Sequence, residues 1–105
     1  MVYANLVTWK FKSGMREKAL ETIDKHGDEG MKTEGFKGML AFDSVDDPNT
    51  AYILSLWDSE ESLDEAREGL IKSIQGEIRD MAAEPPAMKI LKAREMAAQM
   101  VSIPA

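Results

Sequence analysis

The sequence predicts a single α+β domain in which a four-stranded antiparallel sheet carries helices on one face. Apolar and β-branched residues form four short segments typical of strands. Between them, apolar residues recur at helical spacing in two longer segments. A chain of 105 residues is also the length of one domain. The expected order is strand, helix, strand, strand, helix, strand.

The first strand is expected over residues 2–12. Its odd positions form a large, mostly aromatic face: Tyr3, Val7, Trp9 and Phe11. Its even positions are apolar at first and charged later, which indicates a strand covered on both faces at its start. Asn5 interrupts the aromatic face, and a buried amide needs partners or a polar cavity. Asn5 is therefore either a satisfied structural amide or a polar group in a pocket.

The first helix is expected to begin at Ser13-Gly14 and to end at Gly35. Gly27 and Gly30 weaken its last turns. Its apolar stripe consists of Met15, Ala19, Leu20, Ile23 and Met31.

His26 is the only histidine of the sequence and lies near the weak end of this helix. One imidazole without Cys or a second His does not make the usual zinc site. Two roles stay open. The helix dipole favours a partly exposed histidine at this position, and a pocket role is the alternative.

The second strand is expected over residues 36–44, with Phe36, Gly38, Leu40 and Phe42 on one face. Residues 46–49 read Asp-Asp-Pro-Asn, which predicts a turn. The third strand, over residues 50–57, then completes a hairpin. The acidic residues of the turn lack the ligand spacing and central Gly of a calcium loop.

The third strand runs directly into a helix start. Asp58 or Ser59 is expected to cap that helix, with Glu61 as the acidic partner of a capping box. Trp57 lies at the junction, where a side chain serves either as core or as a pocket wall.

The second helical region is expected over residues 59–83, divided near Gly69 and stopped by Pro85-Pro86. Its stripe is Leu63, Ala66, Leu70, Ile74, Ile78 and Met81. The last strand is expected over residues 87–95. Residues 1–95 then form the domain, and the apolar tail 96–105 is expected to pack on a partner chain.

This order of elements is the split βαβ, or ferredoxin-like, arrangement. Its helices cover one face of the sheet, while the other face still carries apolar side chains. A homodimer that stacks sheet on sheet is the expected cover for that face.

Composition restricts the partners. The formal net charge is −6 and the pI about 4.8, which argues against nucleic acid and anionic membranes. The sequence has no Cys, so it has no disulfide, thiol nucleophile or Cys-ligated metal. No signal-peptide pattern or long apolar run is present, and a cytoplasmic protein is expected.

Residues 53–61 (ILSLWDSEE) and 34–38 (EGFKG) resemble the antibiotic biosynthesis monooxygenase group of dimeric α+β barrel proteins. The likeness runs from Val2 to Glu95 and includes Pro85-Pro86. The resemblance implies a ferredoxin-like protomer that pairs as a dimeric barrel, with a pocket between sheet and helices. The superfamily includes cofactor-free quinol and polyketide monooxygenases, haem-degrading enzymes and isomerases.

The haem-degrading branch is similar in Trp57 and in the stretch from His26 to Phe36. It combines a first-strand Asn, the third-strand Trp and a His downstream of that Trp. Here Asn5 lies two positions early, and the region after Trp57 contains no histidine. The resemblance therefore does not extend to haem degradation.

The remaining expectation is a cofactor-free oxygenase that oxidises a small quinol or phenol with O₂, without metal or haem. Under this resemblance Asn5 is the hydrogen-bond donor to the substrate anion, and His26 is a candidate base. Tyr3, Trp9 and Trp57 would form the pocket walls. The alternative is a non-catalytic ligand-binding, signalling or structural dimer of the same fold.

Overall fold

The computed structural model describes residues 2–94. Four antiparallel strands form one sheet in the order β2-β3-β1-β4. The strands are β1 (Tyr3–Lys10), β2 (Phe36–Asp43), β3 (Thr50–Trp57) and β4 (Ala87–Lys92). The bounds of β3 agree with the sequence prediction, and β4 ends before the predicted residue 95 because its last pairing with β1 joins Lys92 to Tyr3.

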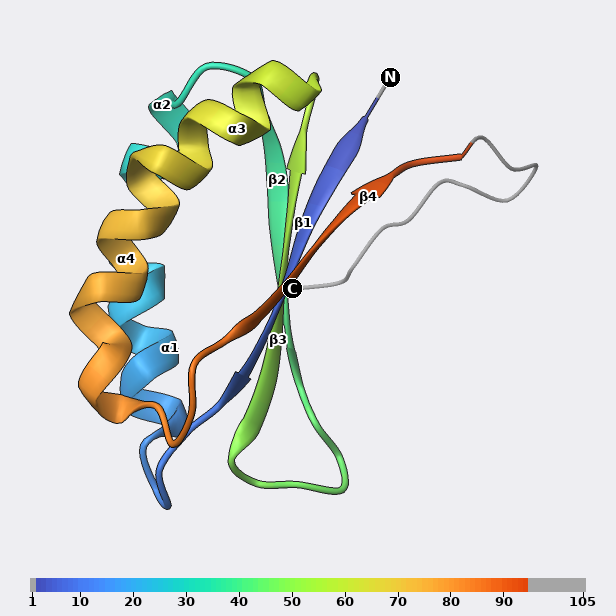
Figure 1. Cartoon of the computed structure of the whole chain (residues 1–105). Helices are drawn as coiled ribbons and strands as arrows, with labels where there is room; N and C mark the ends of the chain where they lie inside the picture. Colours follow the sequence, from blue (N-terminus) through green and yellow to red (C-terminus); the bar gives the residue numbers. More distant parts are fainter. Residues whose placement is uncertain (1, 95–105) are drawn as a thin grey trace.

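The helices form one layer on one face of this sheet (Figure 1). They are α1 (Arg16–Asp24), α2 (Gly27–Lys32), α3 (Glu60–Glu68) and α4 (Leu70–Ile78), followed by the 3₁₀ turn η1 (Arg79–Met81). The predicted ferredoxin-like α+β fold is confirmed. The part of the chain that the structure describes contains no helix long and apolar enough to cross a membrane.

The odd-numbered face of β1 lies under the helices, as its pattern predicts. Val7, Trp9 and Phe11 are buried with Ile53 of β3 and Ile78 of α4 in one core cluster. A second cluster joins Trp57 to Leu63 and Ala66 of α3. The core is therefore divided along the sheet into two groups of side chains.

The predicted single helix before β2 is instead two helices, α1 and α2. The backbone N–H of His26 donates to the carbonyl of Ile23 at 3.0 Å, which closes α1, and α2 begins anew after His26. This break shifts the helical phase, so Met31 is 76% exposed and does not belong to the apolar stripe. Gly30 is buried instead, against the ring of Phe36.

Strand β2 contains a bulge that the alternation of its residues does not predict. The register shifts between Phe36 and Gly38, and Gly38 adopts φ +141°. Phe36 pairs with Trp57 and Met39 pairs with Ser55, so Phe36 and Met39 share the helix-covered face. The expectation that Phe36 shares a face with Leu40 was wrong, because the extra residue reverses the alternation.

Ser59 is the cap of α3, which settles the choice between Asp58 and Ser59. Its Oγ accepts a hydrogen bond from the backbone N–H of Ser62 at 3.0 Å. The third helical residue is thus Ser62, and the expected capping-box role of Glu61 was wrong by one position. Gly35 packs against this turn with φ +83°, and a Cβ there would overlap Ser62 Oγ.

The predicted turn between β2 and β3 is held by Asp47. Its carboxylate accepts hydrogen bonds from the backbone N–H of Asn49 at 2.9 Å and the hydroxyl of Thr50 at 2.7 Å. These bonds, the backbone bond first, lower the pKa of Asp47. Arg16 of α1 donates to the carbonyls of Asp47 and Thr50, which ties the helix layer to this turn.

The face of the sheet opposite the helices stays apolar. The strand register places three large apolar side chains on that face. They are Phe42, Tyr52 and Leu91, which are 45%, 36% and 43% exposed. The helix layer lies entirely on the other side (Figure 1). The predicted tail 96–105 lies outside the described residues.

Candidate functional site

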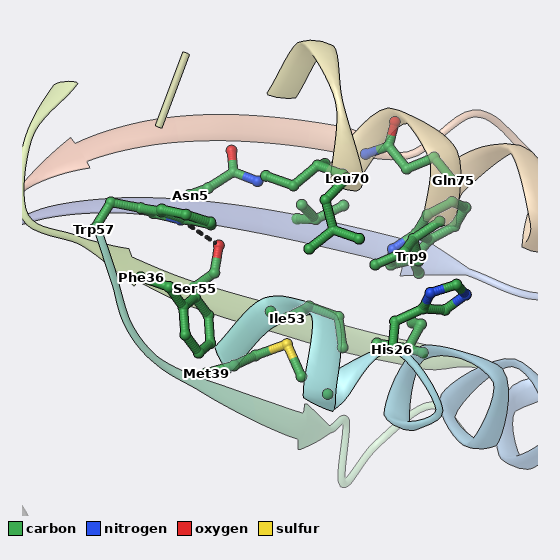
Figure 2. A pocket seen from close by; sticks show the side chains of 16 residues that line it. Asn5, Trp9, His26, Phe36, Met39, Ile53, Ser55, Trp57, Leu70 and Gln75 are labelled. Atoms are coloured by element: carbon green, nitrogen blue, oxygen red, sulfur yellow. Dashed lines mark hydrogen bonds between the residues drawn. The ribbon is translucent and has the colours of Figure 1, made fainter. Parts of the chain in front are cut away.

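A cavity lies between the sheet and the helices α2 and α4 (Figure 2). Its volume is about 80 Å³, and apolar and aromatic side chains form most of its wall. It is smaller than the roughly 150 Å³ cavity that accepts benzene. An aromatic ring therefore needs a wall side chain to move outward. Met39 lines the cavity, is 40% exposed and has the flexible side chain suited to such movement.

Asn5 places an amide in this apolar wall. It is 1% exposed, and its Oδ1 has no hydrogen-bond partner among the described residues. An unpaired buried acceptor costs about 1–3 kcal/mol relative to a paired one. The position follows from the register, because Asn5 lies opposite Ser55 of β3 on the helix-covered face. The amide is thus held where a ligand hydroxyl or N–H can pair with it.

Ser55 and Trp57 form a hydrogen-bonded pair beside Asn5. Trp57 Nε1 donates to Ser55 Oγ at 3.0 Å, and both residues are buried. The ring of Phe36 meets Trp57 edge to face, with ring centroids 5.3 Å apart. Figure 2 shows Asn5, Trp57 and Phe36 at one end of the cavity. This end, defined by Asn5, Ser55, Trp57 and Phe36, is called the closed end below.

The other end is formed by Trp9, His26 and Gln75 and is called the open end below (Figure 2). Trp9 stacks on Phe11 with ring centroids 5.6 Å apart. Gln75 of α4 donates from Nε2 to the sulfur of Met88 at 3.2 Å. A thioether is a weak acceptor, so this bond holds the glutamine side chain loosely.

His26 joins α2 to α4 at the open end. Its Nδ1 lies 2.7 Å from Glu29 Oε1, and its Nε2 contacts Glu77 Oε2. The bond to Glu29 is the largest cause that raises the pKa of His26, partial burial opposes it, and Glu77 adds to the rise. With a carboxylate at each ring nitrogen, the imidazolium form is favoured. No lone pair is free for proton abstraction while both contacts persist.

The family model for antibiotic biosynthesis monooxygenases matches residues 2–70, more than half of the chain. The chain belongs to the antibiotic biosynthesis monooxygenase family. No curated protein sequence matches it significantly.

Solved structures agree with this family in fold. A cofactor-independent oxygenase from Streptomyces nogalater, SnoaB, is 10% identical with a TM-score of 0.78, covering 93% of this chain and 98% of its own. A conserved protein from Methanosarcina mazei is 17% identical with a TM-score of 0.78, covering 90% and 94%. A Mycobacterium tuberculosis protein is 15% identical, with the same TM-score, and covers 93% and 100%. At these identities the likeness concerns the fold alone.

Four of the five site residues expected from the sequence and the family resemblance line one cavity: Asn5, Trp9, His26 and Trp57. Tyr3 does not line it. Tyr3 packs against the cluster of Trp57 and Leu63, because it is the outermost residue of β1 on that face.

The structure adds Phe36, Ser55 and Gln75 to the wall of the cavity. Ser55 carried a sequence signal, because it alone interrupts the apolar and aromatic run 52–57 and lies two positions before Trp57. Phe36 had none, because the bulge decides its face. Within residues 2–94 no group of three or more His, Cys, Asp or Glu side chains is placed to hold a metal ion.

Proposed function

We propose that this pocket binds a small phenol or hydroquinone and oxidises it with O₂, the substrate supplying the electrons in place of a cofactor. The supporting observation is the buried Asn5 amide, whose Oδ1 lacks a partner among the described residues within a mostly apolar wall. Membership of the antibiotic biosynthesis monooxygenase family supports the same chemistry.

Asn5 is the proposed polar anchor for the reacting hydroxyl. Its planar amide offers an acceptor, Oδ1, and a donor, Nδ2, and a half-turn about Cβ–Cγ exchanges them. The acceptor suits the neutral phenol, and the donor suits the phenolate. A donor aimed at the developing anion in a water-excluded site stabilises it more strongly than water does. Trp9, Trp57 and Phe36 orient the ring by packing on its faces and edge.

The proposed reaction begins when the hydroxyl loses its proton to solvent, before the ligand enters the cavity. The anion then passes one electron to O₂, which gives a phenoxyl radical and superoxide. These combine through a new bond between a ring carbon and oxygen, and the resulting peroxide anion takes back a proton from solvent to form a hydroperoxide. Cleavage of the O–O bond releases water and leaves one oxygen on the ring. For a hydroquinone the balance is hydroquinone plus O₂ to hydroxyquinone plus water.

We propose a different role for His26 from that of the base expected from the family resemblance. It is the one titratable side chain among the described residues that line the cavity. Both of its nitrogens contact carboxylates. We therefore propose that His26 holds α2 to α4 and that the acidity of the substrate itself governs its ionisation.

The test compares Asn5→Leu with the unchanged protein. Oxygen uptake with hydroquinones should fall by about 100- to 1,000-fold, the scale of losing one oxyanion donor. Stability to urea should stay equal or rise, because the substitution removes an unpaired buried acceptor. Ser73→Ala, at an exposed position of α4, is the control and should retain full uptake. Uptake that survives in folded Asn5→Leu would remove Asn5 from the mechanism.

A non-catalytic binding protein is the second candidate, favoured by the small volume of the cavity. Quenching of Trp9 and Trp57 fluorescence by phenols, without any O₂ uptake, would identify it. These are the two tryptophans of the sequence, and both line the cavity, so the signal reports on the site.

We also propose a homodimer in which two protomers pack together through the sheet face opposite the helices. The apolar side chains there, Phe42, Tyr52 and Leu91, need a cover. An obligate interface of this kind buries about 2,000 Å² or more in total. Phe42→Glu should give a monomer in light scattering, whereas Val45→Glu, 99% exposed in the turn, should stay dimeric. A monomeric unchanged protein at micromolar concentration would refute the dimer.

A further inference from the structure

A second cavity of about 450 Å³ adjoins the open end of the first. Trp9 and Gln75 line both cavities, so these two side chains form the shared wall. The outer cavity continues along Arg79 and the segment 82–86 that leads into β4. The small inner cavity and the larger outer one therefore meet at Trp9 and Gln75.

Gln75 is the movable part of this wall. It is half-buried, and within residues 2–94 the one hydrogen bond of its side chain runs to the thioether of Met88. Trp9, by contrast, is 3% exposed and stacked on Phe11. Rotation of Gln75 costs one weak bond, whereas rotation of Trp9 disrupts the core. Gln75 is therefore placed to join the two cavities when a ligand spans them.

The outer cavity carries a positive charge, that of Arg79, about one helical turn from Gln75. Arg79 follows Gln75 by four residues and lies on the same side of α4 and its 3₁₀ extension. Among the ion pairs of residues 2–94, none involves Arg79. Glu84, the acidic residue of the same cavity, pairs with Lys10 at 3.4 Å. The guanidinium is thus available to a negatively charged group.

We propose that the substrate has an aromatic head that enters the inner cavity and a flexible tail that passes Gln75 and ends in a carboxylate at Arg79. This inference rests on the proposed function, since the head is the phenol described above. Four residues of helix rise about 6 Å, a distance that a chain of three or four carbons spans. Gln75 would then select tailed ligands, and Arg79 would select anionic ones.

The test uses three probes: phenol, a phenol with a para butanoate chain, and its neutral butanol analogue. Titration calorimetry and tryptophan quenching measure their affinities. In the unchanged protein the butanoate should bind more tightly than the butanol analogue. Arg79→Gln should weaken the butanoate by about 2- to 5-fold, the scale of an exposed ion pair, without affecting the butanol analogue. Raising the salt concentration to about 1 M should remove the tighter binding of the butanoate relative to the butanol analogue.

Lys72→Gln is the matched control, because it removes one exposed positive charge from α4 outside both cavities. It should leave all three affinities unchanged. Gln75→Phe, which fills the passage, should weaken both tailed probes more than phenol. Equal affinity of the butanoate and the butanol analogue, or equal losses in Arg79→Gln and Lys72→Gln, would overturn this inference alone. Failure of all three probes to bind would overturn the proposed function as well.

Discussion

The two ends of the inner cavity are held by different kinds of contact. At the closed end, Asn5 and Ser55 lie opposite each other on paired strands, and Trp57 is 1% exposed with its indole N–H bonded to Ser55. At the open end, His26 contacts carboxylates that are half or more exposed, and Gln75 relies on a sulfur acceptor. The closed end is fixed by the sheet, whereas the open end is fixed by side chains at the surface.

This difference assigns a task to each end. Catalysis needs the reacting group held to a fraction of an ångström, which a strand register and buried hydrogen bonds provide. Ligand entry needs parts of the wall to move, and exposed side chains reorient in nanoseconds. The closed end therefore suits the hydroxyl of the proposed substrate, and the open end suits admission and selection of the rest of the proposed ligand.

The largest effects expected from this comparison are at the hydrogen-bonded pair of Ser55 and Trp57. Ser55→Ala leaves the indole N–H of Trp57 buried without its acceptor and should cost about 1–3 kcal/mol of unfolding free energy in urea. Trp57→Phe alone should cost more, because it also removes buried ring atoms.

The double variant Ser55→Ala with Trp57→Phe separates the hydrogen bond from the packing. Once Trp57 is Phe, adding Ser55→Ala should cost little, since no donor is left unpaired. If Ser55→Ala costs the same in both backgrounds, the hydrogen bond does not stabilise the closed end.

The smallest effect is expected at His26, and it depends on pH. The pKa of His26 is raised in the folded protein, with Glu29 as the main cause. The stabilisation is therefore fully present below the unfolded pKa of about 6.5. This stabilisation is lost as the pH rises through the higher pKa that His26 has in the folded protein. Its size should be about 1 kcal/mol or less, because the two carboxylates are exposed.

The measurement is the urea midpoint across this pH range for the unchanged protein, His26→Gln and Glu77→Gln. The decline with rising pH should vanish in His26→Gln and shrink in Glu77→Gln. Glu65→Gln, an exposed carboxylate of α3 in no ion pair among the described residues, is the control and should keep the full decline. A decline that persists in His26→Gln would show that the open end is not held by this histidine.

Local chemistry made much of the fold predictable. Alternation along residues 3–10 indicates which face of β1 is buried, the run 50–57 defines β3, and Gly69 divides the second helical region. These features depend on neighbours within a few residues, so periodicity and glycine placement reveal them. Asn5 is singled out because it interrupts the aromatic face of its strand, and Trp57 because it lies where a strand runs into a helix start.

The rest of the site depends on contacts between distant segments. The bulge in β2 turns Phe36 toward Trp57, a pairing that spans two strands. The partner of His26, Glu77, lies 51 residues away. By sequence Gln75 is an ordinary helix residue, and only the folded chain brings it to Met88 of β4. The sequence by itself therefore determined the elements and the buried face of β1. The tertiary structure decided which side chains enclose the cavity and which of them can move, because register shifts and pairings across the fold leave no local pattern.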